Sequence, residues 1–163
     1  MKTIKVKPLS KEAFYKYGSY AAFIDPVNEP ATGPKDAPLV FLRDMLPVDM
    51  AAPCFSTLRV QSRPMVVADA EFHDTTCEVA MPLDGDAVIW CAPAGAGEEL
   101  PLDEVEAFLV PKGTAVMFRP GVWHHAAFPA ADAPLNVLIV LPERTYVNDL
   151  FAITLDEKFA IEL

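Results

Sequence analysis

The chain has 163 residues, of which 52% are hydrophobic, and a formal net charge of −10. This length suits one domain with one sizeable core, and this hydrophobic content excludes general disorder. The acidic charge argues against nucleic acid or an anionic membrane as a partner, because both require dense positive charge. We expect a single domain over residues 1–163 that acts on a small molecule.

The first residues contain lysines but no continuous apolar stretch, so no signal peptide is expected. No segment approaches the ~20 apolar residues of a membrane span. Cys54, Cys77 and Cys91 are odd in number and scattered, which favours reduced thiols over a disulfide framework. These features together predict a cytoplasmic protein.

One short helix is predicted near the start, with Ser10 as its N-cap, residues 11–17 as its body and Gly18 as its end. The chain has sixteen prolines, which favour strands and turns over long helices. Residues 25–38 hold four of them, and we predict a long loop there that borders the binding site as a lid.

From residue 55 onwards the pattern is typical of β structure. Short runs rich in Val and Phe are separated by turn-forming residues, which indicates a sandwich or barrel. The predicted strands are 55–60, 65–73, 78–81, 87–91, 105–110, 115–118, 123–128 and 135–141. Residues 150–163 are expected to form a last edge strand. The barrel core would then span about residues 39–145, with the N-terminal helix and the C-terminal strand packed on it.

All three histidines lie in two stretches about fifty residues apart. Alternate residues of a strand share a face, so Glu71 and His73 are expected side by side. A four-residue hairpin loop would place Glu78 opposite His73. A regular strand turns only one of two adjacent histidines toward a site, and we expect that one to be His124, with His125 either supporting the ligands or packed behind His124. Two imidazoles and one carboxylate with open positions are typical of a catalytic transition-metal site.

The spacing of these stretches resembles the two motifs of the cupin superfamily. In the first motif, Glu71-x-His73 is followed by four residues, Glu78, six residues and Gly85, with Glu71 and Met65 in place of the usual histidine and leading glycine. The second motif runs from Gly113 through Pro120-Gly121 to His124. It departs from the pattern at Arg119, where a proline is usual, and at Phe128, where an asparagine is usual.

This resemblance covers roughly residues 55–141. It implies an all-β, cupin-like double-stranded β-helix (jelly-roll barrel) with a short N-terminal helix. It also implies a divalent metal ion held by His73, Glu78 and His124, with Glu71 as a fourth ligand or a nearby base. Mn, Ni, Zn or Fe would each suit such mixed nitrogen and oxygen ligands. Cupins often form dimers, so a homodimer is expected.

Within the superfamily, two stretches are similar to the ureidoglycolate lyase family: residues 8–18, and Val122-Trp123-His124-His125 together with the His73 to Gly85 region. This chain departs from that family in two places. It lacks the family's usual Asn-Asn-Gly near residues 25–38, and it has Glu78 where glutamine is common. The second departure favours metal binding in this chain.

The family resemblance implies metal-assisted cleavage of ureidoglycolate to glyoxylate and urea, a step of allantoin degradation in purine metabolism. Glu71 or His125 would act as general base, and Arg59 would hold the substrate carboxylate. The alternative for Glu71 is a solvated carboxylate at a strand end, and the alternative for Arg59 is a surface or salt-bridged arginine. Another metal-dependent cupin enzyme, an isomerase or Fe(II) dioxygenase, is a second hypothesis. A non-enzymatic cupin that binds a small molecule is the third.

Overall fold

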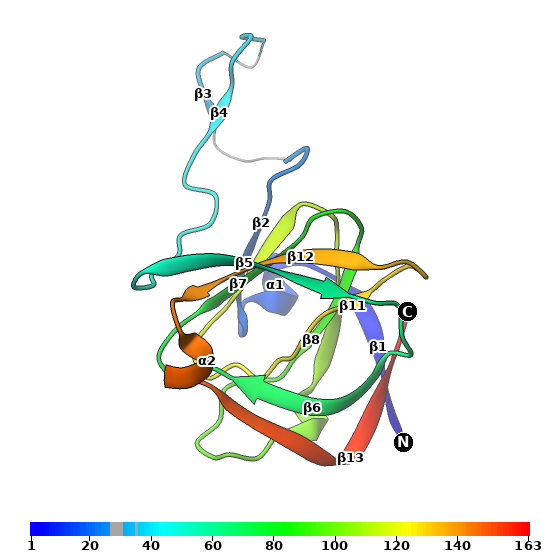
Figure 1. Ribbon diagram of the computed structural model, residues 1–163. Helices are drawn as coiled ribbons and strands as arrows, with labels where there is room; N and C mark the ends of the chain where they lie inside the picture. The colour runs from blue at the N-terminus through cyan, green and yellow to red at the C-terminus, as the bar shows by residue number, and fades with distance from the viewer. Residues whose placement is uncertain (27–30, 35) are drawn as a thin grey trace.

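The computed structural model describes residues 1–26, 31–34 and 36–163, and Figure 1 shows their arrangement. The elements before residue 60 are β1 (Lys2–Pro8), α1 (Lys11–Phe14), β2 (Gly18–Ala22), β3 (Ala31–Thr32), β4 (Phe41–Leu42) and β5 (Pro53–Val60). They are followed by β6 (Val66–Phe72), β7 (Glu78–Pro82), β8 (Ala87–Cys91), the 3-10 turn η1 (Leu102–Glu104), β9 (Glu106–Val110) and β10 (Thr114–Phe118). The last are β11 (Phe128–Pro129), β12 (Leu135–Pro142), α2 (Thr145–Asn148) and β13 (Phe151–Glu162). None of the helices among these residues has the length and apolar character needed to cross a membrane.

The strands form two main sheets that face each other around a common interior. One sheet has the order β11-β8-β9-β1-β13-β6 and the other has the order β2-β10-β7-β12-β5. Val116 of β10 and Val137 of β12 point into the interior and meet Ile89 and Phe108 of the opposite sheet in one buried cluster. The predicted all-β barrel of two facing sheets is confirmed.

The six-stranded sheet also curls, so that β8 is buried on both faces. Ile89 belongs to the interior cluster, whereas Val88 and Trp90 pack on the other side against residues of β6 and β13. The ring of Trp90 meets Phe159 edge to face at 5.3 Å between centroids. Burial on both faces explains the continuous apolar run at 87–91, because neither side of this strand meets water.

The helix near the N-terminus is shorter than expected. Ser10 is its N-cap, as predicted, and its hydroxyl accepts a hydrogen bond from the N–H of Ala13 at 3.2 Å. The helix ends at Phe14, and Gly18 begins β2 instead of ending the helix. Gly18 is required there because a Cβ would lie 1.7 Å from the backbone oxygen of Met117 on the paired strand β10.

Both ends of the chain are integral to the barrel. Strand β1, which the sequence pattern did not predict, pairs in parallel with β9 and with β13. Strand β13 lies between β1 and β6 within the sheet, so it is not an edge strand. The barrel therefore extends beyond the expected core of about residues 39–145.

Residues 25–38 also differ from the predicted long loop. Their described part contains β3, which pairs only with β4 and carries the chain away from the barrel (Figure 1). Residues 27–30 and 35 of this predicted loop lie outside the described residues. None of its described residues lines the interior cavity, so the predicted lid is wrong for this part of the chain.

Candidate metal centre

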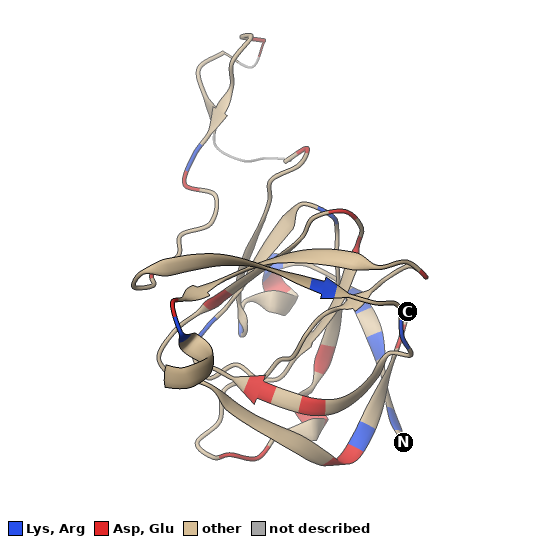
Figure 2. Ribbon diagram, in the orientation of Figure 1, with Lys and Arg blue, Asp and Glu red and all other residues tan. Residues whose placement is uncertain are grey.

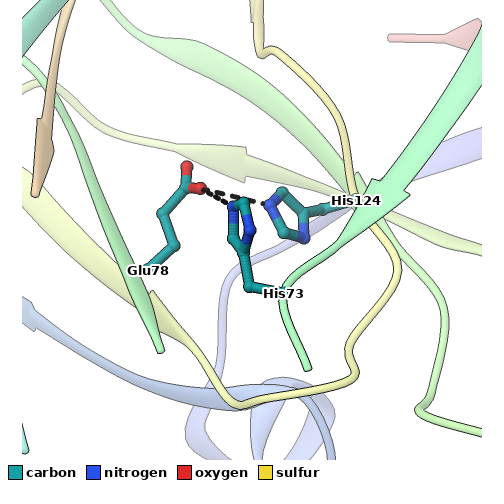
Figure 3. A group of neighbouring side chains, drawn as sticks. All are labelled: His73, Glu78 and His124. Carbon is teal, nitrogen blue, oxygen red and sulfur yellow. Dashed lines mark hydrogen bonds and ion pairs between the residues drawn. The ribbon is translucent and has the colours of Figure 1, made fainter. Parts of the chain in front are cut away.

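Three buried side chains meet at one end of the barrel interior: His73, Glu78 and His124 (Figure 3). We call them the triad. Their exposed fractions are 3%, 8% and 3%. Oε2 of Glu78 lies 3.1 Å from Nε2 of His73 and 3.3 Å from Nε2 of His124. The structure thus brings together the three residues that were expected to be ligands.

The first two members of the triad come together at a corner between the sheets. His73 follows β6 of one sheet, and Glu78 begins β7 of the other, so the expected hairpin between these strands is wrong. The carboxylate of Asp149 holds the corner by accepting hydrogen bonds from the N–H of Asp74 at 2.8 Å and of Thr75 at 3.0 Å. The loop geometry is therefore set partly by a residue more than seventy positions away.

The last member, His124, lies in an extended segment without regular strand pairing. A single antiparallel bridge joins it to Glu71, and both backbone hydrogen bonds of that bridge are formed. The ring of Phe118 stacks on the His124 imidazole, with centroids 4.7 Å apart and an angle of 6°. The bridge fixes the backbone and the stacking fixes the ring, so His124 is held in one orientation.

Hydrogen bonds determine which ring nitrogen of each histidine faces Glu78. Nδ1 of His73 lies 2.6 Å from the carbonyl oxygen of Asp149, and Nδ1 of His124 lies 2.8 Å from that of Val122. A carbonyl oxygen only accepts, so both Nδ1 atoms carry the proton. In the neutral rings both Nε2 lone pairs therefore point toward the Glu78 carboxylate. Lone pairs and a negative carboxylate repel one another, so this arrangement requires either a cation between them or protonation of a ring.

The pKa values of the triad reflect the same conflict. Burial raises the pKa of Glu78, but the charges and hydrogen bonds of His124 and His73 outweigh burial and lower that pKa to about 2. Burial lowers the pKa of both histidines, yet Glu78 and the two backbone carbonyls raise these pKa values above the usual range. The triad is thus built to hold positive charge beside an ionised carboxylate.

The separations and donor types fit a divalent metal ion. Ligand atoms that share one metal ion at about 2.1 Å lie about 3.0–3.4 Å apart in octahedral or tetrahedral coordination. The two nitrogen–oxygen separations, 3.1 and 3.3 Å, fall in this range, and the three candidate ligand atoms all lie within 4.8 Å of one another. Two imidazole nitrogens and one carboxylate oxygen suit Mn, Fe, Ni or Zn and leave coordination positions open.

A cavity of ≈ 200 Å³ adjoins the triad. Its polar lining consists of Glu71, Glu78, His125 and Tyr146, and the rest is apolar. Of the described residues that line it, none is a lysine or arginine. An anionic ligand in this cavity would therefore need the positive charge of a metal ion or a protonated histidine.

Two residues lie elsewhere than the sequence pattern indicated. His125 lines the cavity, because residues 122–127 do not alternate as a regular strand would, so of its two expected positions the one packed behind His124 is wrong. Arg59 is exposed, and its guanidinium donates to Oδ1 of Asn136 at 3.1 Å. Its neighbour Leu58 lines the cavity, so Arg59 points to the other face of β5.

Tyr146 and Asp149, which sequence reasoning missed, belong to this region. Tyr146 comes from helix α2 and is 65% exposed, but partial burial and the charges of Glu78 and Glu71 raise its pKa, so the hydroxyl stays protonated. Asp149 follows the same helix and supports both His73 and the corner. No motif spacing marks either residue, because their roles depend on how the chain returns after β12.

A double-stranded β-barrel with two histidines and a carboxylate converging at one end of its interior defines a cupin with a candidate metal centre. Within that class, the sequence profile of the ureidoglycolate lyase family matches residues 1–162. The chain belongs to this family, and the resemblance seen in residues 8–18 and 122–125 is confirmed.

Individual relatives agree with this assignment. A protein named putative ureidoglycolate lyase from Agrobacterium fabrum is 32% identical over 141 residues, which covers 82% of this chain and 79% of the relative. Ureidoglycolate lyase from Burkholderia cepacia is 29% identical over 143 residues, covering 84% and 78%. Among solved structures, a dTDP sugar isomerase from Desulfovibrio desulfuricans has a TM-score of 0.54 at 14% identity, with 85% of each chain covered. This last likeness concerns the fold alone.

Proposed function

We propose that this protein is a metal-dependent lyase that cleaves ureidoglycolate to glyoxylate and urea. The observation that carries the proposal is the convergence of two Nε2 lone pairs and the Glu78 carboxylate beside a small cavity that also presents Glu71 and His125. Family membership supplies the substrate, because the relatives from Agrobacterium and Burkholderia bear this name.

The size of the cavity supports a small hydroxy acid. Its volume of ≈ 200 Å³ is below the about 300–1,000 Å³ typical of pockets for larger organic ligands. A compact substrate would fill the cavity and leave little room for water. Arg59 was expected to hold the substrate carboxylate, but it points away from the cavity. In this proposal the metal ion holds that carboxylate instead.

When bound to the triad, a divalent metal ion supplies Lewis-acid chemistry that makes a substrate hydroxyl more acidic. Glu71 or His125, which both line the cavity, removes the proton from that hydroxyl. The C–O bond then becomes C=O, the C–N bond breaks, and its electron pair stays on the urea nitrogen. Tyr146, whose raised pKa keeps its hydroxyl protonated, donates a hydrogen bond to this nitrogen, and the proton that the base removed passes to the nitrogen to complete urea.

Two other functions use the same donor set. An Fe(II) dioxygenase or an isomerase would need the same open coordination positions, and a binding module would need only the cavity. The lyase ranks first because two polar groups, Glu71 and His125, are available beside the triad as bases. Oxygen consumption with bound iron would favour the dioxygenase, and bound metal without turnover would favour the binding module.

A homodimer and a cytoplasmic location are part of the same proposal, as is a role in allantoin degradation. Cys54, Cys77 and Cys91 are free thiols, which supports a reducing compartment.

The test combines metal analysis with an assay of glyoxylate release from ureidoglycolate. Protein purified without chelators should contain about one divalent metal ion per chain and release glyoxylate. His124→Ala should lose both the metal and the activity. The matched variant His125→Ala should keep the metal and lose about 10- to 100-fold in activity, as expected for one of two possible bases. Metal-loaded protein that releases no glyoxylate at any pH from about 6 to 9 would refute the lyase.

A further inference from the structure

The cavity beside the triad has two ends of different chemistry. At the triad end its lining presents the polar side chains Glu71, Glu78, His125 and Tyr146. Farther along, the described residues of β5, β7, β8 and β12 that line it all carry hydrocarbon side chains: Leu58, Ala80, Ile89, Val137 and Ile139. We call this part the apolar end.

The pairing of β7 with β12 sets the order of these residues along the cavity. Glu78 is the first residue of β7, and Ala80 lies two residues further on, about 7 Å along the strand. Ala80 is paired with Ile139 of β12. Two residues further from the triad, Val137 is paired with Leu58 of β5. The apolar end therefore begins directly behind Glu78 and leads away from the triad.

This end offers a ligand little to hydrogen-bond with. In the described sheet, β7 lies between β10 and β12, and β12 lies between β7 and β5, so their N–H and C=O groups are used in pairing. Figure 2 shows β12 without charged residues. A polar group placed here would lose its hydrogen bonds to water and gain none, whereas a hydrocarbon group would be stabilised.

Ureidoglycolate matches the triad end better than the apolar end. Its hydroxyl and carboxylate are the groups that a metal ion at the triad would hold, so the group beyond its nitrogen remains to occupy the rest of the cavity. That group is a carbamoyl, which ends in an NH2 with two donor hydrogens. A simple acyl group has a hydrocarbon chain in place of this NH2, and the chain would contact hydrocarbon side chains.

Building on the proposed lyase function, we infer that the protein also cleaves N-acyl-2-hydroxyglycines that carry a short apolar acyl chain, with Val137 and Leu58 selecting the chain. The hydroxyl loses its proton, its C–O bond becomes C=O, and the C–N bond breaks. The electron pair of that bond stays on the nitrogen, which takes up the proton. The products are glyoxylate and a primary amide, and no further reactant is needed.

A substrate series tests the acyl chain. Metal-loaded protein is assayed for glyoxylate release from ureidoglycolate and from N-acetyl-, N-propionyl- and N-butyryl-2-hydroxyglycine, and each rate is divided by the uncatalysed rate. The N-acetyl compound, in which CH3 replaces NH2, should have a kcat/KM at least equal to that of ureidoglycolate. Each further methylene should raise kcat/KM about fourfold until the cavity is full. The N-succinyl compound, which ends in a carboxylate, should not be cleaved, because no described lining residue is a lysine or arginine.

Binding without turnover gives a second readout. Glycolate, 2-hydroxybutyrate and 2-hydroxyhexanoate keep the hydroxyl and carboxylate but have no C–N bond to break. Isothermal titration of metal-loaded protein should show a dissociation constant that falls about fourfold with each added methylene.

Two matched variants locate the selecting contact. Val137→Thr places a hydroxyl at the apolar end with little change in size and should lower the kcat/KM ratio of the N-propionyl compound to ureidoglycolate about fivefold or more. Val140→Thr makes the same change on the same strand, but Val140 packs on the outer face with Val79 and Ala115, so the ratio should not change. Both substrates are compared in the same protein, so a partial loss of folding or of metal cancels from the ratio.

The outcomes separate this activity from the proposed function. Cleavage of ureidoglycolate with a kcat/KM for the N-acetyl and N-propionyl compounds below about a tenth of its value would overturn the inference and leave the lyase proposal standing. Hydroxy-acid affinities that do not rise with chain length, or equal effects of Val137→Thr and Val140→Thr, would do the same. Cleavage of the acyl compounds without cleavage of ureidoglycolate would support the inference and overturn the proposed substrate. Glyoxylate release from none of them would overturn both.

Discussion

Asp149 connects a candidate metal ligand to the corner that follows it. Its carboxylate accepts three hydrogen bonds, from the N–H of Asp74 and from the N–H and hydroxyl of Thr75, at 2.8, 3.0 and 2.7 Å. Its backbone carbonyl accepts the Nδ1–H of His73 at 2.6 Å. Asp149→Ala removes the first three bonds and leaves the carbonyl without the side chain that anchors it.

The size of the effect follows from these contacts. A hydrogen bond contributes about 0.5–1.5 kcal/mol net, and water replaces part of the loss because this loop is exposed, so we expect the free energy of unfolding to fall by about 1–3 kcal/mol. In a domain of this size, that lowers the melting temperature by about 2–12 °C. Metal affinity at the triad should fall about 10- to 100-fold, because His73 loses the support that sets its ring orientation.

The assay is competition for Zn²⁺ with a chromophoric chelator, at a temperature where both proteins are fully folded, alongside thermal unfolding and nitrogen NMR of the His73 ring. Asp149→Asn should be intermediate, since its amide keeps one acceptor oxygen. Asp74→Asn is the control, because Asp74 is exposed in the same loop and contributes its backbone N–H to this contact. A lower melting temperature with metal affinity within about twofold of wild type would refute the reasoning and leave Asp149 a purely structural residue.

Three further outcomes are expected. In chelator-treated protein, the triad should stabilise the fold most between about pH 4.5 and 6.5. The histidine pKa values are raised in the folded protein, so their contribution to stability is lost as pH rises through these pKa values. The Glu78 pKa is lowered, so its contribution is lost as pH falls toward about 2. Urea unfolding across this range measures it, and a flat profile would contradict it. Glu78→Gln should weaken Zn²⁺ binding about 10-fold or more, because a neutral amide replaces the anionic ligand, whereas unchanged affinity would exclude the carboxylate as a ligand. Gly18→Ala should destabilise the fold by about 3 kcal/mol in thermal unfolding, because its Cβ would meet the Met117 backbone, while Gly95→Ala, with open space around it, should have little effect.

The sequence by itself determined the class of fold and the members of the triad. Short apolar runs separated by turn residues predicted most strands between 55 and 141, because burial on alternating or both faces leaves a local pattern. The spacing around His73 and His124 predicted the triad, because each motif lies within a few residues of a strand end. The hairpin expected between His73 and Glu78 was wrong, because β6 and β7 belong to different sheets. The triad was still predicted correctly, because the corner between the sheets brings the same residues together.

The tertiary structure alone decided which other residues surround the triad. Residues 2–8 form a lysine-rich segment without a clear local strand pattern. They become strand β1 because β9 and β13, which lie far along the chain, pair with them. His125 turns into the cavity because residues 122–127 follow single bridges rather than a regular ladder. Arg59 turns away from the cavity, and Asp149 reaches His73 from the far end of β12, for the same physical reason: these positions depend on long-range pairing that no local spacing encodes.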